Sequence, residues 1–318
     1  MSNTFDDKTQ GADVTKMFPE RVKQKTSGLK RGDLAATTAD ALAHGGAKTI
    51  IYTGRSQSEL QPVIDHINRK YKTVEMIFVT ADPGSLSSFR EAAHTIQSLG
   101  VSIDGFIGFP DAMAVPWELT ADGVESHFQK NYLCYFLLLN LLCDVMGDRS
   151  RVVLVTSSLR NEAPAPSWDD LEFENGENYH SLDGYSQSML AIILFIKSIA
   201  KKYRGSIAAF SANPGNTKTN VQTYVAWDEI KSWLQRKKEG YPAGEDIPVL
   251  LQQAPKSLAQ GSATVLRGLL DPELEVHSGA FLDHCQIPKL PHLDFPTGEE
   301  SAEALWKRSY DLVELFLS

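Results

Sequence analysis

Short apolar runs alternate with longer amphipathic stretches along the chain, and this alternation predicts an α/β fold. Residues 151–158 (RVVLVTSS) form a β-branched apolar run, which is typical of a strand buried on both faces of a parallel sheet. Residues 184–203 have helical composition and a basic last turn, which suits the carbonyl end of a helix. Further strands are predicted at residues 49–55, 73–82 and 103–109. The pattern favours one doubly wound, Rossmann-like parallel sheet with helices on both faces, in which ligands bind at the carboxyl ends of the strands.

The first strand of this sheet is the weakest part of the pattern. Residues 22–26 (VKQKT) are too polar for a central strand that is covered on both faces. Residues 27–34 (SGLKRGDL) then contain Gly28 and Gly32, and glycines in a turn of this kind let backbone amides approach a pyrophosphate. Two glycines four residues apart are a weak signal, so a relic phosphate-binding loop and an ordinary turn stay equally open. We therefore expect a first strand and glycine loop that are degenerate or shortened.

Length, charge and cysteine content narrow the class of protein. The 318 residues carry a net charge of -9, which argues against nucleic-acid or anionic-membrane partners because both need a positive field. The three cysteines lack metal-ligand spacing, so we predict no metal site and reduced thiols in a cytoplasmic protein. Residues 132–146, the most apolar segment, are too few to span a membrane. We expect a polar leader at residues 1–25 and one domain at 26–318, with a substrate-lid region at 221–260.

Residues at the end of one predicted strand and the start of the next helix carry a family resemblance. Ser158, Tyr185 and the sequence YSQSMLAIILF resemble the catalytic strand and helix of the short-chain dehydrogenase/reductase family. The branch they resemble is retinol-dehydrogenase-like and WW-domain-oxidoreductase-like, with many fungal members. The resemblance implies that Tyr185 gives a proton to a substrate carbonyl, Ser158 orients its oxygen, and Asn131 holds a water for the proton relay. Register leaves Ser157 as an alternative to Ser158.

The resemblance also implies an NADP site and contacts to it. Arg55 would pair with the 2′-phosphate and select NADP, with a solvated loop arginine as the alternative. Asp82 would lie beside the adenine, with a turn or helix cap as an equal alternative. Thr219 would hydrogen-bond the nicotinamide carboxamide. The full set of expected cofactor residues is Gly28, Gly32, Arg55, Asp82, Pro214, Gly215 and Thr219.

Three departures from the family pattern fall at the reacting end of this site. The family motif Tyr-x-x-x-Lys ends here in Met189, which supplies neither a positive charge nor a hydrogen-bond donor. Leu34 stands where the third glycine is expected, and residues 108–111 (GFPD) replace Asn-Asn-Ala-Gly. A nearby cation lowers the pKa of an ionisable group by roughly one to three units. The loss of the lysine therefore predicts slow hydride transfer, and the three departures together predict an NADP site that is weakened or lost.

Three functions stay open on the sequence alone. The first is an NADP-linked oxidoreductase for a carbonyl or alcohol of a small molecule that tolerates these departures, with impaired hydride transfer. Lys30 or Lys218 stays open as a replacement for the missing lysine. The second is a non-redox isomerase, dehydratase or cyclase of secondary metabolism that uses Ser158 and Tyr185. The third is a catalytically silent binding or dimerisation partner of a competent relative. The family resemblance implies a dimer interface on the helices containing Asn131 and Tyr185, so a homodimer through these helices also stays open.

Overall fold

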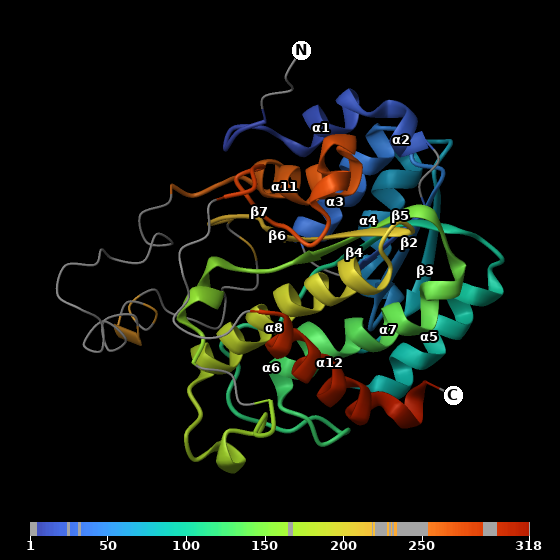
Figure 1. The fold of residues 1–318 in the computed structure, drawn as a ribbon. Coiled ribbons are helices and arrows are strands. Elements are labelled where there is room, and N and C mark those ends of the chain that lie inside the picture. The colour runs from blue at the N-terminus through green and yellow to red at the C-terminus, as the bar shows by residue number, and fades with distance from the viewer. Residues whose placement is uncertain are drawn as a thin grey trace.

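A seven-stranded parallel sheet forms the centre of the molecule (Figure 1). The computed structural model describes residues 5–23, 26–30, 33–164, 168–217, 219, 228, 230, 232–233, 254–288 and 298–317. The strand order is β3-β2-β1-β4-β5-β6-β7, which reverses direction between β1 and β4 and confirms the predicted doubly wound fold. The strands are β1 (Thr26–Lys30), β2 (Thr49–Gly54), β3 (Glu75–Thr80), β4 (Ile103–Gly108), β5 (Met146–Val155), β6 (Ile207–Asn213) and β7 (Phe281–Asp283).

The residues expected to form a glycine turn instead form β1. Gly28 pairs with Ile51 of β2 on one side and with Phe106 of β4 on the other, so it lies inside the central strand. The prediction that Gly28 belongs to a phosphate-binding turn is therefore corrected. β1 has only five residues, in keeping with a shortened first strand. Gly32 lies outside the described residues.

Helices cover both faces of the sheet because its central strands bury alternate residues on opposite sides (Figure 1). Val152 and Leu154 of β5 pack on one face, and Val153 packs on the other. The first face carries α5 (Leu86–Ser98), α7 (Cys134–Leu142), α8 (Ser181–Lys202) and α12 (Glu299–Val313). The second carries α1 (Gly11–Met17), α3 (Asp33–His44), α4 (Gln57–Lys70) and α11 (Leu258–Leu270). Two further helices are short: α2 (Pro19–Lys23) and α6 (Ser126–Phe128).

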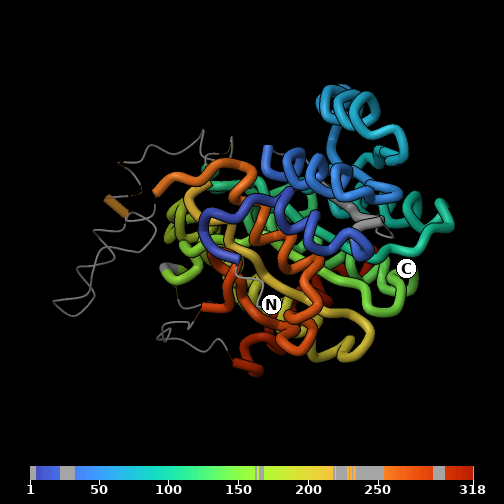
Figure 2. The backbone as a smooth tube through the Cα atoms, turned by 90° about the horizontal axis from the view of Figure 1, so that it is seen from above, coloured from blue at the N-terminus to red at the C-terminus, as the bar shows by residue number. Residues whose placement is uncertain are grey.

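The residues before β1 pack onto the domain. Phe5 and Val14 are buried in the same apolar cluster as residues of α3 and α11. Gly11 lies so close to α11 that a Cβ at this position would be 2.3 Å from Ser262 Oγ, so a larger residue would clash. Figure 2 shows the dark blue α1 beside the orange α11. The described part of the expected polar leader is thus a structural layer of the domain.

The helices expected to form a dimer interface are already covered within the chain. Phe136 of α7 and Phe195 of α8 both contact Trp306 of α12, with ring centroids 5.0 and 5.8 Å apart. Tyr132 hydrogen-bonds Ser309 of α12 at 2.7 Å. Because α12 occupies these apolar faces, the structure does not support a homodimer through the helices containing Asn131 and Tyr185.

Within the described residues, no helix is both long enough and apolar enough to cross a bilayer.

Candidate active site

A cleft of about 490 Å³ opens at the carboxyl ends of β2, β4, β5 and β6, where the strand order reverses. Open α/β sheets bind ligands at this position, and the volume lies within the roughly 300–1,000 Å³ of small-molecule sites. The lining residues include 33–36 of α3, Arg55, 109–111, 155–157, Tyr185, Met189, 213–217 and Thr219. Residues distant in sequence therefore meet at one edge of the sheet.

Tyr185 lies in the first turns of α8 and contributes its side chain to the cleft. The helix begins after His180, whose Nδ1 accepts a hydrogen bond from the Leu182 amide at 3.2 Å. Burial raises the pKa of Tyr185 to about 12, and a hydrogen bond with the Ser157 hydroxyl offsets part of that rise. The phenol is therefore protonated throughout the neutral range.

The structure distinguishes the two candidate serines at the end of β5. Ser157 lines the cleft, hydrogen-bonds Tyr185, and accepts a hydrogen bond from the Leu159 amide at 3.2 Å. Ser158 begins the short 3₁₀ helix Ser158–Glu162, and its buried Oγ has no hydrogen-bond partner among the described residues. The structure therefore places Ser157, the alternative that the register left open, beside Tyr185, and it does not place Ser158 in the cleft.

Met189 lies one helical turn beyond Tyr185, and its side chain lines the same cleft. It is 2% exposed, and its carbonyl accepts a 2.9 Å hydrogen bond from Thr156 Oγ1, which ties α8 to the end of β5. Arg55 is the only cation among the described residues that line the cleft. Lys197 lines a separate cavity near the other end of α8. The Lys30 side chain and Lys218, the two suggested replacements, lie outside what the structure describes.

Similarity to known proteins extends over most of the chain. The chain is 28% identical to human polyprenol dehydrogenase over 303 residues, covering 92% of this chain and 85% of that protein. It is 27% identical to the human WW domain-containing oxidoreductase, covering 87% of this chain and 64% of that protein. A short-chain dehydrogenase of Burkholderia cenocepacia, solved in complex with NADP, has a TM-score of 0.60 at 19% identity, covering 82% of this chain and 96% of that one. No family model matches the chain.

The chain thus resembles short-chain dehydrogenase/reductases in sequence and in fold. Asn131 lies in a π-helical turn between α6 and α7, a type of irregularity that is frequent at functional sites. Its Nδ2 donates to the Ala112 carbonyl at 2.8 Å and to Ser188 Oγ at 3.0 Å, and its Oδ1 accepts from the Ala112 amide at 3.1 Å. Asn131 does not line the cleft, so it fixes the loop after β4 against α8.

Some of the expected cofactor residues line the cleft and one does not. Arg55, Pro214, Gly215 and Thr219 line the cleft, and Gly215 has a φ of +74°, a conformation that favours glycine. Asp82 does not line it; its Oδ1 accepts a hydrogen bond from the Gly84 amide at 2.9 Å, so it caps the turn before α5. The turn-cap alternative for Asp82 is the one that the structure supports.

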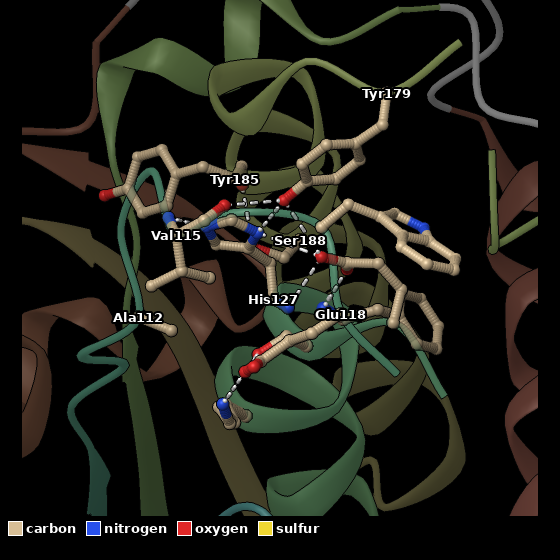
Figure 3. A network of polar contacts seen from close by, with 12 residues as sticks. Ala112, Val115, Glu118, His127, Tyr179, Tyr185 and Ser188 are labelled. Atoms are coloured by element: carbon tan, nitrogen blue, oxygen red, sulfur yellow. Dashed lines mark hydrogen bonds and ion pairs between the residues drawn. The ribbon is translucent and has the colours of Figure 1, made fainter. Parts of the chain in front are cut away.

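A buried polar network beside Tyr185 was not predicted from the sequence (Figure 3). His127 Nδ1 lies 3.0 Å from Glu125 Oε1 and 2.9 Å from the Tyr179 hydroxyl. Its Nε2 accepts a 3.2 Å hydrogen bond from the Val115 amide, so the proton of this imidazole is assigned to Nδ1. Figure 3 shows the Tyr185 hydroxyl pointing away from this network. The imidazole ring packs edge-on against Tyr185, with centroids 6.1 Å apart, and supplies no cation to the phenol.

The sequence offered little to reveal this network, because its members are far apart in the chain. Tyr179 and His127 are 52 residues apart, and a lone histidine on an apolar helix is unremarkable. One signal was present at Gly184, the residue before Tyr185. A Cβ there would lie 2.8 Å from the Tyr179 ring and 3.2 Å from His127 Nδ1. Glycine at this position lets the network pack directly against α8.

Proposed function

We propose that this protein is an NADP(H)-linked oxidoreductase for a carbonyl or alcohol group of a small molecule, and that its hydride transfer is slow. The observation that carries the proposal is the cleft at the strand-order reversal, which joins Arg55 at one end with the hydrogen-bonded Tyr185 and Ser157 at the other. The similarity to polyprenol dehydrogenase and the NADP-bound structure of the same fold support it.

The residues of the cleft fit a dinucleotide better at its adenine end than at its reacting end. Arg55, which follows β2, offers a guanidinium that pairs well with a 2′-phosphate. At the other end, Phe109 and Asp111 line the cleft where small residues are expected. A bulky ring and a carboxylate there oppose the binding of an anionic cofactor. We therefore expect NADP(H) to bind, with weakened affinity.

The chemistry of the reacting end follows from Tyr185 and Ser157. NADPH, when bound, supplies the hydride. Ser157 would hold the substrate carbonyl oxygen through its hydroxyl, and Tyr185 would pass its phenolic proton to that oxygen. The pKa of about 12 makes this phenol a weak acid, and Met189 adds no charge to stabilise the phenolate that remains. Tyr185 and Ser157 would thus be placed to deliver the proton, but Met189 would not stabilise the phenolate that forms.

Apolar side chains on one side of Tyr185 indicate the kind of substrate. Leu159, Leu182, Ile230 and Trp233 are buried in one cluster, and Tyr185 packs against it. Ile230 and Trp233 are described residues of the expected lid region. We infer that the carbonyl or alcohol is attached to an apolar body that this cluster would contact.

The raised pKa of Tyr185 gives no advantage to the non-redox alternative. Acid–base catalysis is most efficient when the pKa of the catalytic group lies near the working pH. A phenol with a pKa of about 12 is far from that value, so Tyr185 would isomerise or dehydrate a substrate no better than it would support reduction.

Fluorescence titration of NADPH, with NADH in parallel, tests the proposal. We expect NADPH to bind more tightly than NADH, and slow NADPH oxidation in the presence of apolar aldehydes or ketones. Arg55→Ala should weaken NADPH binding by about 10- to 100-fold, because a charge-assisted hydrogen bond contributes about 1.5–3 kcal/mol, and should leave NADH binding unchanged. Failure to bind either nucleotide would refute the proposal.

A further inference from the structure

A second cavity, of about 720 Å³, lies at the opposite end of the sheet from the cleft. Its walls come from the early part of β5, the start of β6 and the last turns of α8, whereas the cleft lies at the far ends of these same elements. No part of the proposed oxidoreductase chemistry uses this cavity.

The cavity concentrates positive charge on an acidic protein. Its lining contains Arg149, Arg151, Lys197, Lys201 and Arg204, with Glu275 as the one acidic residue. Lys201 is paired with Glu299 and Glu303 of α12. The remaining four cations face a single carboxylate, although the whole chain carries a net charge of -9.

The cavity is more than a cluster of surface charges, because one of its arginines, Arg151, is buried. The side chain is 1% exposed, and its Nη1 donates to the carbonyls of Gly268 and Asp271 at 3.0 and 2.7 Å. Its buried Nη2 has no hydrogen-bond partner among the described residues, and its ion pair with Glu275 is 3.9 Å long. An unsatisfied buried guanidinium nitrogen costs free energy, which an anionic acceptor in the cavity would recover.

Charge balance around Arg151 also favours an additional anion. Burial lowers the pKa of Arg151 to about 10, and repulsion by Arg21 adds to this effect. Glu275 lies 3.7 Å from Arg21 and 3.9 Å from Arg151, so one carboxylate is shared between two guanidinium groups. The Asp271 carboxylate also attracts Arg151, but it already pairs with Arg267 at 2.9 Å, so the arginines here outnumber the carboxylates beside them.

The C-terminal end of α8 does not account for this charge. Basic residues near a helix C-terminus offset the negative end of the helix dipole, which would explain Lys201 and Lys202. Arg149 and Arg151, however, come from β5. Arg149 has a φ of +62°, a conformation that costs a non-glycine residue of order 1–3 kcal/mol and that occurs preferentially at functional sites.

We propose that this cavity binds a small phosphate-bearing ligand, whose phosphate oxygens pair with Arg149, Arg151 and Arg204. Guanidinium groups match phosphate with two parallel hydrogen bonds, and three of them around one cavity favour a ligand with several negative charges. Ala200 and Val276 also line the cavity, and Val276 is 85% exposed, so the ligand would have a small apolar part next to its phosphates.

Isothermal titration calorimetry with pyrophosphate tests this site. The test variant is Arg149→Gly combined with Arg204→Ala: both residues are exposed, and glycine relieves the positive φ at residue 149. We expect pyrophosphate to bind the unmodified protein, and the double variant to bind it at least about tenfold more weakly. NADPH binding by the double variant should be unchanged, which separates this site from the proposed function.

Two single variants serve as controls. Lys72→Ala removes an exposed cation that does not line the cavity, and Arg55→Ala removes the cation of the cleft; neither should change pyrophosphate binding. Undiminished binding by the double variant, equal loss in Arg55→Ala, or a dissociation constant weaker than about 10 mM would overturn the proposal. Co-sedimentation with vesicles containing phosphatidylinositol phosphate, lost in the double variant, would identify the source as a lipid headgroup. Its absence, with pyrophosphate bound, would identify a soluble molecule.

Discussion

Replacement of Met189 by lysine tests whether the missing cation limits the activity. The Met189 side chain lines the cleft one helical turn from Tyr185, so an ammonium placed there would lie near the phenol. A cation at close range lowers a pKa by roughly one to three units, which would bring Tyr185 from about 12 to about 9–11. Each unit corresponds to about 1.4 kcal/mol, so the phenolate would gain about 1–4 kcal/mol.

If that gain is fully expressed in proton transfer, NADPH oxidation should accelerate by about 10- to 1,000-fold. The primary assay is the alkaline titration of tyrosinate absorbance, with the matching Tyr185→Phe protein subtracted so that only this residue is followed. Met189→Gln is the matched control, because the glutamine side chain is polar and close to lysine in length but carries no charge. The reasoning is wrong if folded Met189→Lys and Met189→Gln proteins titrate with the same midpoint.

Three further predictions follow from contacts in the same region. Asn131→Ala should lower the free energy of unfolding in urea by about 2–4 kcal/mol, because it leaves buried groups unpaired; Asn140→Ala, which loses one bond to its own helix, should cost about 1 kcal/mol. Ser157→Ala should raise the pKa of Tyr185 and slow turnover, whereas Ser158→Ala should preserve both; the reverse pattern in pH–rate profiles would contradict our assignment. The raised pKa of Tyr185 means that its contribution to stability is complete below about pH 10 and is lost as the pH rises through about 12. Chemical denaturation over that range should therefore show a smaller decline for Tyr185→Phe than for the unmodified protein.

The parallel sheet was predictable because the amino-acid composition of most of its strands is typical of buried strands. Residues 151–155 are β-branched and apolar, and such a run is stable only when both faces are covered. β1 was missed for the same reason: Thr26–Lys30 is short and carries little apolar area, and its position depends on pairing with β2 and β4. Tertiary contacts override local propensity at such a strand.

The position of the candidate site was predictable to within one residue at Ser157, because the strand end and the start of α8 both have strong sequence signals. The choice between Ser157 and Ser158 depends on the backbone turn at the end of β5, which the amino-acid pattern does not encode. Asp82 shows a different limit, since a carboxylate after a strand suits a turn cap as well as a ligand contact. The network around His127 depends on contacts between distant segments and was invisible for that reason.

The packing of α1 against α11 has a practical consequence for anyone who engineers this protein. A truncated version beginning at Thr26 would remove Phe5 and Val14 and would uncover the apolar surface that they cover on α3 and α11. Because α3 also supplies one wall of the cleft, such trimming would expose an apolar patch next to the cleft. Aggregation during expression would then be an effect of the shortened boundary, and it would say nothing about the intrinsic foldability of the Rossmann sheet.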